Sequence, residues 1–341
     1  LVLATYGHSD VLEPMLESLA NQTWLGFELI VVDQNADDRV VPMLEPIRQA
    51  GITVTHLKAS APNLSAARNA GIAAAAGQWV AFPDDDCWYE EDCLARVVEA
   101  IESTPQIDGW VIDWVEATGG TGLTAPTFDA PTFRSFRGGD ASSITLFLKT
   151  SIVRDIAGFD VRIGVGRYYG AGEETDLMIR LLDHGATIRR RSQARVHHHH
   201  SSERPELSRL ALRAVMRRER GVGALYAKHR LKTRIIARGL LAPLVNGVMN
   251  RQPLKGFLFA CATVAGRIDG MFRWRLDRTA HSTRQQVEAM QPRPPRAGSA
   301  SHRDTDVISE GATRAASTAV TTPGQGEKMS DESIRLKREV Q

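Results

Sequence analysis

Three consecutive aspartates, Asp84, Asp85 and Asp86, follow the apolar run 79–82. Adjacent carboxylates repel one another, so such a run is costly unless a cation lies among them. In an extended chain Asp84 and Asp86 project to the same side, and oxygen ligands of this kind suit Mg2+ or Mn2+. The alternative is a solvated acidic turn in which an aspartate caps a helix over residues 88–100.

Other polar residues stand where neighbouring elements begin or end. Thr5 and Tyr6 follow the first apolar run, and Asp33 follows the second, where its carboxylate can accept hydrogen bonds from a nucleobase or ribose. Asn63 and Arg68 lie before and on the helix that leads to the acidic run. Arg68 can pair with a diphosphate or with the carboxylates themselves. The simpler readings are a loop aspartate and a surface arginine.

A second acidic pair, Glu173 and Glu174, follows the glycine-rich stretch 170–172 and opens a helix. A helix N-terminus favours negative charge and keeps a carboxylate ionised, although helix-capping acids would look the same. Further along, His197 and His198 begin a run of four histidines. Histidine is a common metal ligand, and a solvated loop is the alternative.

The elements that must position these residues alternate regularly. Apolar runs over 1–4, 29–32, 52–54 and 79–82 predict strands, and the patterns over 10–22, 40–50 and 63–76 predict helices. Such alternation is typical of an α/β fold with a doubly wound, mainly parallel sheet flanked by helices. Ligands bind such sheets at the carboxyl edge, where the polar residues gather. Residues 150–157 and 174–184 are also expected to be helical, whereas 110–147 show only a loose pattern.

The ordered set of motifs resembles the family 2 glycosyltransferases of GT-A fold, over residues 1 to about 200. The set comprises Thr5-Tyr6, Asp33, Asn63 with Ala67-Arg68-Asn69-Ala70-Gly71, the acidic run, Gly158-Phe159-Asp160, Glu173-Glu174 with Asp176 and Arg180-Leu181, and then a histidine. The order and spacing of the whole set are more specific than any single motif.

The resemblance implies a metal-dependent, inverting transfer of a sugar from a nucleotide-diphosphate donor. Thr5, Tyr6 and Asp33 would contact the nucleoside, with Asn63, Arg68, Asp84 and Asp85 also in the donor site. Asp84 and Asp86 would hold Mn2+ or Mg2+, with Asp86 the more direct ligand, joined by His198 or His197. The catalytic base maps to Glu174, with Glu173 as the alternative, because glutamate replaces the more usual aspartate here.

Charge divides the chain into unlike parts. Residues 1–116 carry 19 acidic and 5 basic residues, whereas residues 203–278 carry 17 basic and 5 acidic residues. We therefore expect a catalytic domain over 1–202, a basic amphipathic helical extension over 203–278, and a disordered tail over 279–341. The extension suits peripheral contact with an anionic membrane, although helices packed on the catalytic domain would share its pattern. No nucleic-acid-binding motif is present.

Composition sets the remaining expectations. Three cysteines, Cys87, Cys93 and Cys261, form no disulfide framework and fit a reducing cytoplasm, so we expect a protein on the inner face of the cell membrane. The chain opens at Leu1 inside an expected strand, so further residues are expected before it. The expected acceptor is a glycan or lipid-linked hydroxyl in cell-surface or exopolysaccharide synthesis. The alternatives are a nucleotidyltransferase and a non-catalytic nucleotide-sugar or metal-binding module.

Overall fold

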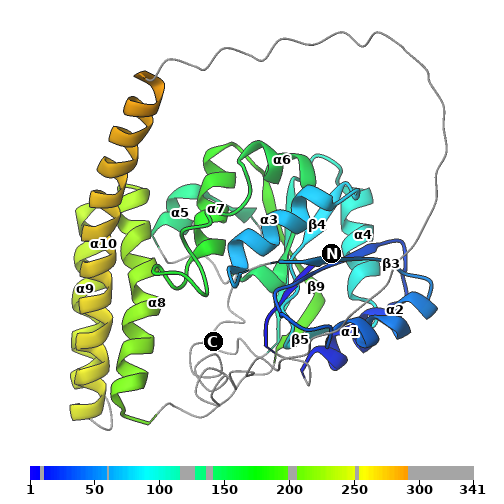
Figure 1. Cartoon of the computed structure of the whole chain (residues 1–341), viewed down its shortest axis with the longest axis horizontal. Coiled ribbons are helices and arrows are strands. Elements are labelled where there is room, and N and C mark those ends of the chain that lie inside the picture. Colours follow the sequence, from blue (N-terminus) through cyan, green and yellow to red (C-terminus); the bar gives the residue numbers. More distant parts are fainter. Residues whose placement is uncertain are drawn as a thin grey trace, which may run out of the picture.

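The computed structural model describes residues 1–7, 11–59, 61–115, 127–135, 141–198, 206–249 and 253–290. Figure 1 shows an α/β unit built around two sheets, with three long helices, α8, α9 and α10, standing beside it. The predicted tail beyond residue 290, together with His199 and His200, lies outside the described residues.

The first sheet is parallel, as the strand-helix alternation predicts. It has the order β1 (Val2–Thr5), β2 (Glu28–Asp33) and β3 (Thr53–Lys58). Its register aligns Thr5 with Asp33 and Asp33 with Lys58, so three polar residues end the sheet side by side. The helical elements that connect or follow these strands are α1 (Leu12–Ala20), η1 (Val41–Leu44), α2 (Glu45–Gln49) and α3 (Leu64–Ala74).

The second sheet departs from the expected mainly parallel arrangement. Its order is β4-β8-β6-β9-β5, with β7 pairing β9, and only the β6–β9 pair is parallel. The strands are β4 (Trp79–Ala81), β5 (Cys87–Tyr89), β6 (Gly109–Trp114), β7 (Thr127–Phe128), β8 (Leu146–Lys149) and β9 (Ile188–His198). The expectation was wrong for this half because buried apolar strands have the same composition in parallel and antiparallel pairs.

Helices cover the second sheet and connect its strands. They are α4 (Cys93–Ser103), α5 (Ala130–Arg134), η2 (Ser143–Thr145), α6 (Thr150–Asp155) and α7 (Glu173–Asp183). The helix expected over 88–100 begins only at Cys93, because Trp88 lies in β5 and pairs with β9. A Trp between a buried Cys and a buried Tyr fits a strand as well as a helix.

Side chains of the sheets pack into two cores, one on each face. In β2, Leu29 and Val31 join one core while Ile30 and Val32 join the other. This follows from the two-residue period of a strand whose faces are both covered. From α1, Leu12, Met15, Leu16 and Leu19 pack into the first core at helical spacing. The sheet is thereby fixed between two helical layers, and its polar strand ends are held in place.

The C-terminal helices form a bundle. They are α8 (Arg209–Lys228), α9 (Thr233–Val248) and α10 (Pro253–Met290), so α10 continues beyond the expected boundary at residue 278. α8 and α10 approach closely: a Cβ at Gly223 or Gly270 would lie 2.0 Å from a backbone oxygen of the facing helix. Among the described residues, no helix combines the length and apolar character needed to cross a membrane.

Candidate active site

The acidic run lies against the carboxyl end of the parallel sheet. Thr5, at the end of β1, donates a hydrogen bond from Oγ1 to Oδ2 of Asp85 at 2.9 Å, and both side chains are buried. Asp85 therefore connects the two sheets at the carboxyl edge, where the sequence analysis predicts the ligand site. Tyr6, the next residue, is only partly buried, so it offers a surface to a ligand that Thr5 does not.

Asp33, at the end of β2, is fully buried and surrounded by donors. Oδ1 accepts from the backbone and the side chain of Asn35, both at 2.9 Å, while Oδ2 lies 3.0 Å from Lys58 Nζ and 3.1 Å from His56 Nε2. Burial alone would raise the pKa of Asp33, but these donors outweigh it and hold the pKa below its usual value. Lys58 and Asn35 were not predicted, although Lys58 ends β3 in register with Asp33.

Arg68 lies in α3 and is buried between the acidic run and the start of α7. Its Nη2 donates to Asp84 Oδ1 at 2.6 Å and to Ser143 Oγ at 2.8 Å, and its Nη1 lies 3.7 Å from Glu173 Oε1. The surface-arginine reading is therefore wrong. One buried guanidinium brings together two acidic motifs separated by almost ninety residues, and they share one site.

Glu173 and Glu174 begin α7 but differ in exposure. Glu173 is buried, and burial raises its pKa to about 8, helped by the charge of Glu174 and opposed by Arg68. Glu174 is only partly buried, and among the described residues its Oε2 atom accepts no hydrogen bond. The raised pKa favours the protonated carboxyl of Glu173, so Glu174 is the better candidate to accept a proton.

The turn Gly158-Phe159-Asp160 packs against Asn69 and Arg68 of α3. Asn69 of α3 accepts from Phe159 N and donates to Phe159 O, both at 2.8 Å. Gly158 has φ +62°, and a Cβ there would lie 2.4 Å from Asn69 Oδ1. Arg180 donates to the carbonyls of Ile156 and Gly158. Asn69 and Arg180 therefore fix the turn that carries Phe159 beneath Arg68, whose guanidinium lies 5.4 Å from the Phe159 ring centroid.

Asn63 has a structural task in addition to any contact with a ligand. Its side chain accepts from Ala66 N and so caps α3, and its amide nitrogen donates to Val161 O. An N-cap oxygen satisfies a backbone donor that the helix itself leaves open. Asn63 consequently fixes the start of the helix on which Arg68 lies.

Strand pairing brings His198 to the acidic run. β5 follows Asp86 and pairs with the end of β9, with Cys87 opposite His198. As a result His198 Nε2 lies 3.2 Å from Asp86 Oδ1. His197 points to the other face of β9, where it stacks on Trp88 and lies 3.2 Å from Glu90 Oε1. The structure therefore brings one of the two candidate histidines, His198, to the site.

The residues present fit a divalent cation only in part. Within the described ranges no group of three or more His, Cys, Asp or Glu side chains is arranged to hold a metal. Asp86 and His198 supply one carboxylate and one imidazole, whereas Asp84 is held by Arg68. Mg2+ is commonly bound by one or two carboxylates together with substrate phosphates and water. The pair therefore suits a cation whose remaining ligands come from a bound phosphate.

Two residues of the C-terminal helical region, Lys228 and His229, contact α7. Asp176, one turn into α7, is fully buried and lies 2.7 Å from Lys228 Nζ and 2.8 Å from His229 Nε2. Lys228 also lies 2.7 Å from Asp160. Burial alone would raise the pKa of Asp176, but His229, Lys228 and Arg180 hold it below its usual value. Sequence reasoning missed these contacts because nothing local links residues 228 and 176.

The first part of the chain is similar to known proteins. Residues 1–142 match the family described as Glycosyl transferase family 2. An uncharacterized glycosyltransferase of Haemophilus influenzae is 32% identical over 109 residues, covering 32% of this chain and 36% of that protein. The succinoglycan biosynthesis protein ExoO of Rhizobium meliloti is 30% identical over 102 residues, covering 30% and 29%. The alignments thus span well under half of these relatives.

Solved structures share the fold over more of the chain. The mannosyltransferase PcManGT from Pyrobaculum calidifontis, solved with GDP-Man and Mn2+, superposes with a TM-score of 0.55 at 13% identity, covering 80% of this chain and 86% of that one. TarS 1–349 of S. aureus, solved with UDP-GlcNAc, gives 0.52 at 15% identity and covers 83% and 90%. Residues 1–142 thus match the family 2 glycosyltransferases, and the solved structures show that most of the chain shares their fold.

Proposed function

We propose that the protein is a metal-dependent, inverting glycosyltransferase that moves a sugar from a nucleotide-diphosphate donor to a hydroxyl group. The observation that carries this proposal is Arg68, buried between Asp84 and Glu173. It puts a fixed cation, a set of carboxylates and a candidate base around one position. The family match and the fold agree with the proposal.

The donor is proposed to lie across the carboxyl ends of β1, β2 and β4. Tyr6 contacts the nucleoside directly, whereas the buried Thr5 and Asp33 act through Asp85 and Asn35, which they hold in place. Arg68 and Asn63 are also assigned to this site. The two complexes of similar fold described above contain a nucleotide sugar, UDP-GlcNAc in one and GDP-Man in the other.

Asp86 and His198 are proposed to hold Mn2+ or Mg2+, with Asp84 beside them. A cation bound by these residues would supply Lewis acidity for the charged, departing diphosphate. Arg68 stabilises the same charge from the other side, because a buried guanidinium needs no reorganisation as the charge develops. Arg68 pairs with Asp84, whereas Asp86 lies next to His198, so Asp86 is proposed as the more direct ligand.

Glu174 is proposed as the general base. Glu174 is only partly buried, although its Oε2 atom is buried, whereas the Glu173 side chain is buried and its pKa is raised. The acceptor oxygen loses its proton to Glu174 and bonds to the anomeric carbon as the bond to the diphosphate breaks. A single displacement inverts the configuration at that carbon, so no enzyme nucleophile is needed.

The acceptor is proposed to be a glycan or lipid-linked hydroxyl at an anionic membrane surface in the cytoplasm. Residues 203–278 carry the positive charge that such a surface attracts. One similar protein is named for succinoglycan biosynthesis, which supports a role in polysaccharide synthesis.

Glu174→Gln tests the proposal against a non-catalytic binding module. With UDP-GlcNAc and GDP-mannose as probes in MnCl2, the wild-type protein should release nucleoside diphosphate by transfer or slow hydrolysis. Loss of a general base should lower turnover by about 10²–10⁴-fold while donor affinity stays within about twofold. Glu102→Gln, an exposed position on α4, is the matched control and should leave both unchanged.

Two outcomes would contradict the assignment. Unchanged turnover in Glu174→Gln would remove this residue as the base. Donor binding with no turnover by the wild-type protein across nucleotide sugars and glycan acceptors would favour the binding module instead.

A further inference from the structure

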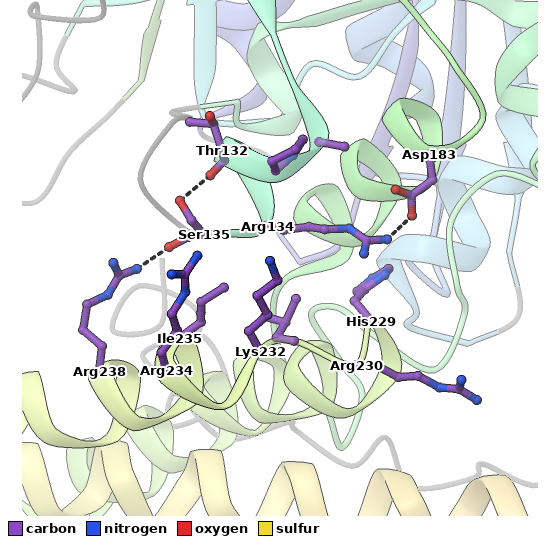
Figure 2. A pocket seen from close by; sticks show the side chains of 13 residues that line it. Thr132, Arg134, Ser135, Asp183, His229, Arg230, Lys232, Arg234, Ile235 and Arg238 are labelled. Atoms are coloured by element: carbon purple, nitrogen blue, oxygen red, sulfur yellow. Dashed lines mark hydrogen bonds and ion pairs between the residues drawn. The ribbon is translucent and has the colours of Figure 1, made fainter.

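A groove of about 950 Å3 lies between α5 and the start of α9, apart from the acidic site. Figure 2 shows α9 along one wall, α5 along the other and the end of α7 at one corner. Asp183 of this groove ends α7, whereas Glu173 begins it. At about 1.5 Å per residue, the helix separates the groove from the proposed base by roughly 15 Å.

The groove is strongly basic. Among the described residues that line it are one acid, Asp183, and the cations Arg134, Arg230, Lys232, Arg234 and Arg238. Arg134 pairs with Asp183, and Arg238 donates to the backbone oxygen of Ser135 (Figure 2). Within the described ranges no acidic side chain pairs with Lys232 or Arg234, and both are exposed. Their side chains extend from α9 toward α5 in Figure 2. The groove therefore presents positive charge that a phosphate would neutralise.

The same face of α9 becomes apolar where it leaves the groove. Arg234 and Arg238 are followed at alternating spacings of three and four by Leu241, Val245 and Val248, with Met249 next to the last. These four apolar side chains are 57–80% exposed. The opposite face of α9 packs on α10, because Gly247 meets Gly256 and Ala260. The exposed apolar stripe is thus a continuation of the basic groove.

This combination suits an amphiphile rather than a soluble anion or a nucleic acid. A free phosphate would use only the cations and would leave the stripe in water. Single-stranded nucleic acids stack on aromatic side chains, and the described residues of the groove lining include no Phe, Tyr or Trp. A helix with cations at one end of a face and exposed aliphatic side chains along the rest matches a charged headgroup joined to a hydrocarbon chain.

We propose that a phosphate-bearing lipid binds along α9, with its headgroup in the groove at Lys232 and Arg234 and its chain on Leu241 and Val245. The inference rests on the proposed membrane contact and deepens it, since it names the face and the lipid chemistry. It does not depend on the proposed chemistry at Glu174. From Arg238 to Val248 the stripe extends about 15 Å, close to the depth of one leaflet of hydrocarbon.

The test uses the full chain and vesicles of phosphatidylcholine with or without phosphatidic acid. The groove variant Lys232→Glu/Arg234→Glu should lower partitioning onto phosphatidic acid vesicles by on the order of tenfold or more. The stripe variant Leu241→Glu/Val245→Glu should weaken partitioning comparably although the groove cations remain. Both should keep the wild-type melting temperature, because all four positions are exposed or half-exposed.

Two control variants match these changes elsewhere on the bundle. Arg213→Glu/Arg218→Glu makes the same charge reversal on exposed positions of α8, and Ile268→Glu/Phe272→Glu makes the same apolar-to-acid change on α10. Each should stay within about twofold of wild type. Equal losses in the groove variant and the α8 control would mean general charge attraction and would overturn the proposal.

Other results would contradict lipid binding and would point to a different ligand or partner at α9. Full displacement by inorganic phosphate, with no effect of the stripe variant, would identify a site for free phosphate. A wild-type dimer that dissociates in the stripe variant, with vesicle binding unchanged, would make the stripe a contact between two copies. Donor binding with UDP-GlcNAc or GDP-mannose in MnCl2 should be unchanged in every variant, which separates failure of this proposal from failure of the proposed function.

Discussion

At the scale of single residues, the site depends on carboxylates held in different electrostatic environments. Glu173 is buried against Arg68, Glu174 is partly open, Asp84 is neutralised by Arg68, and Asp86 lies next to His198. When different environments give neighbouring carboxyl groups different pKa values, one group can act as an acid, another as a base and a third as a ligand in the same site. The residue types alone could not reveal this division, because burial separates Glu173 from Glu174 and the sequence shows two adjacent glutamates.

The raised pKa of Glu173 predicts that Glu173→Gln becomes more stable relative to wild type as the pH rises. A folded-state pKa of about 8, against an ordinary value of 4.5, means that the protonated carboxyl contributes fully in acid. That contribution is lost as the pH rises through the folded-state pKa. The glutamine variant cannot ionise, so its stability relative to wild type should rise by on the order of 1–3 kcal/mol between about pH 5 and pH 8.

Urea unfolding at both pH values in EDTA measures this effect. Glu174→Gln serves as the comparison, since Glu174 is the adjacent glutamate and is only partly buried. An equal stability difference for Glu173→Gln at both pH values would contradict the protonated state assigned to Glu173.

At the scale of elements, the sequence predicted which polar residues follow the strands, but it did not predict which strands pair with each other. Thr5, Asp33 and the acidic run follow apolar runs, and carboxyl ends of parallel strands meet at one edge, so the sequence predicts that these residues gather. β5 and β9 are separated by about one hundred residues, and no local pattern marks them as neighbours. His198 could be chosen by family resemblance, but its contact with Asp86 depends on that pairing.

The β5–β9 pairing predicts how Asp86→Ala and His198→Ala behave. Both side chains are proposed ligands of one cation, so either change should reduce the effect of Mn2+ on nucleotide affinity by on the order of tenfold or more. Titrating each protein with UDP or GDP, once in MnCl2 and once in EDTA, measures the effect of Mn2+ on nucleotide affinity. His197→Ala is the matched control because that side chain faces Glu90, and it should retain the Mn2+ effect. Full retention in Asp86→Ala would remove the metal assignment.

At the scale of the whole molecule, the extension and the α/β unit share buried charges. Lys228 and His229 at the end of α8 meet Asp160 and Asp176, and Arg162 stacks on Trp274 of α10 at 4.1 Å. α8 also lies on the backbone that precedes α7, since a Cβ at Gly221 would be 1.8 Å from Ala171 O. Charge asymmetry in the sequence predicted two dissimilar parts, but it could not place four particular residues in contact.

Lys228→Ala should destabilise the protein by about 2 kcal/mol, because it removes a cation from the buried carboxylate of Asp176. Asp176 would keep only its contacts with His229 and Arg180. The folded-state pKa values of Asp160 and Asp176 are lowered, so the stability they contribute is present above the unfolded pKa and lost as the pH falls. Without Lys228 that loss should begin at a higher pH. Thermal unfolding between neutral and acid pH measures both effects.

Arg218→Ala, an exposed position on the same helix, is the control and should change stability by less than about 0.5 kcal/mol. If Lys228→Ala behaved like Arg218→Ala at every pH, the contacts of Lys228 with Asp160 and Asp176 would not be stabilising.

The position of Asp176 has a practical consequence for anyone who shortens this chain. The family match stops at residue 142, and the composition changes near 202, so both invite a cut before α8. A fragment cut there would retain the glutamates of α7 but would lose Lys228 and His229, which contact the buried carboxylate of Asp176 one turn away. The smallest piece that keeps the helix of the proposed base properly supported therefore extends past residue 229.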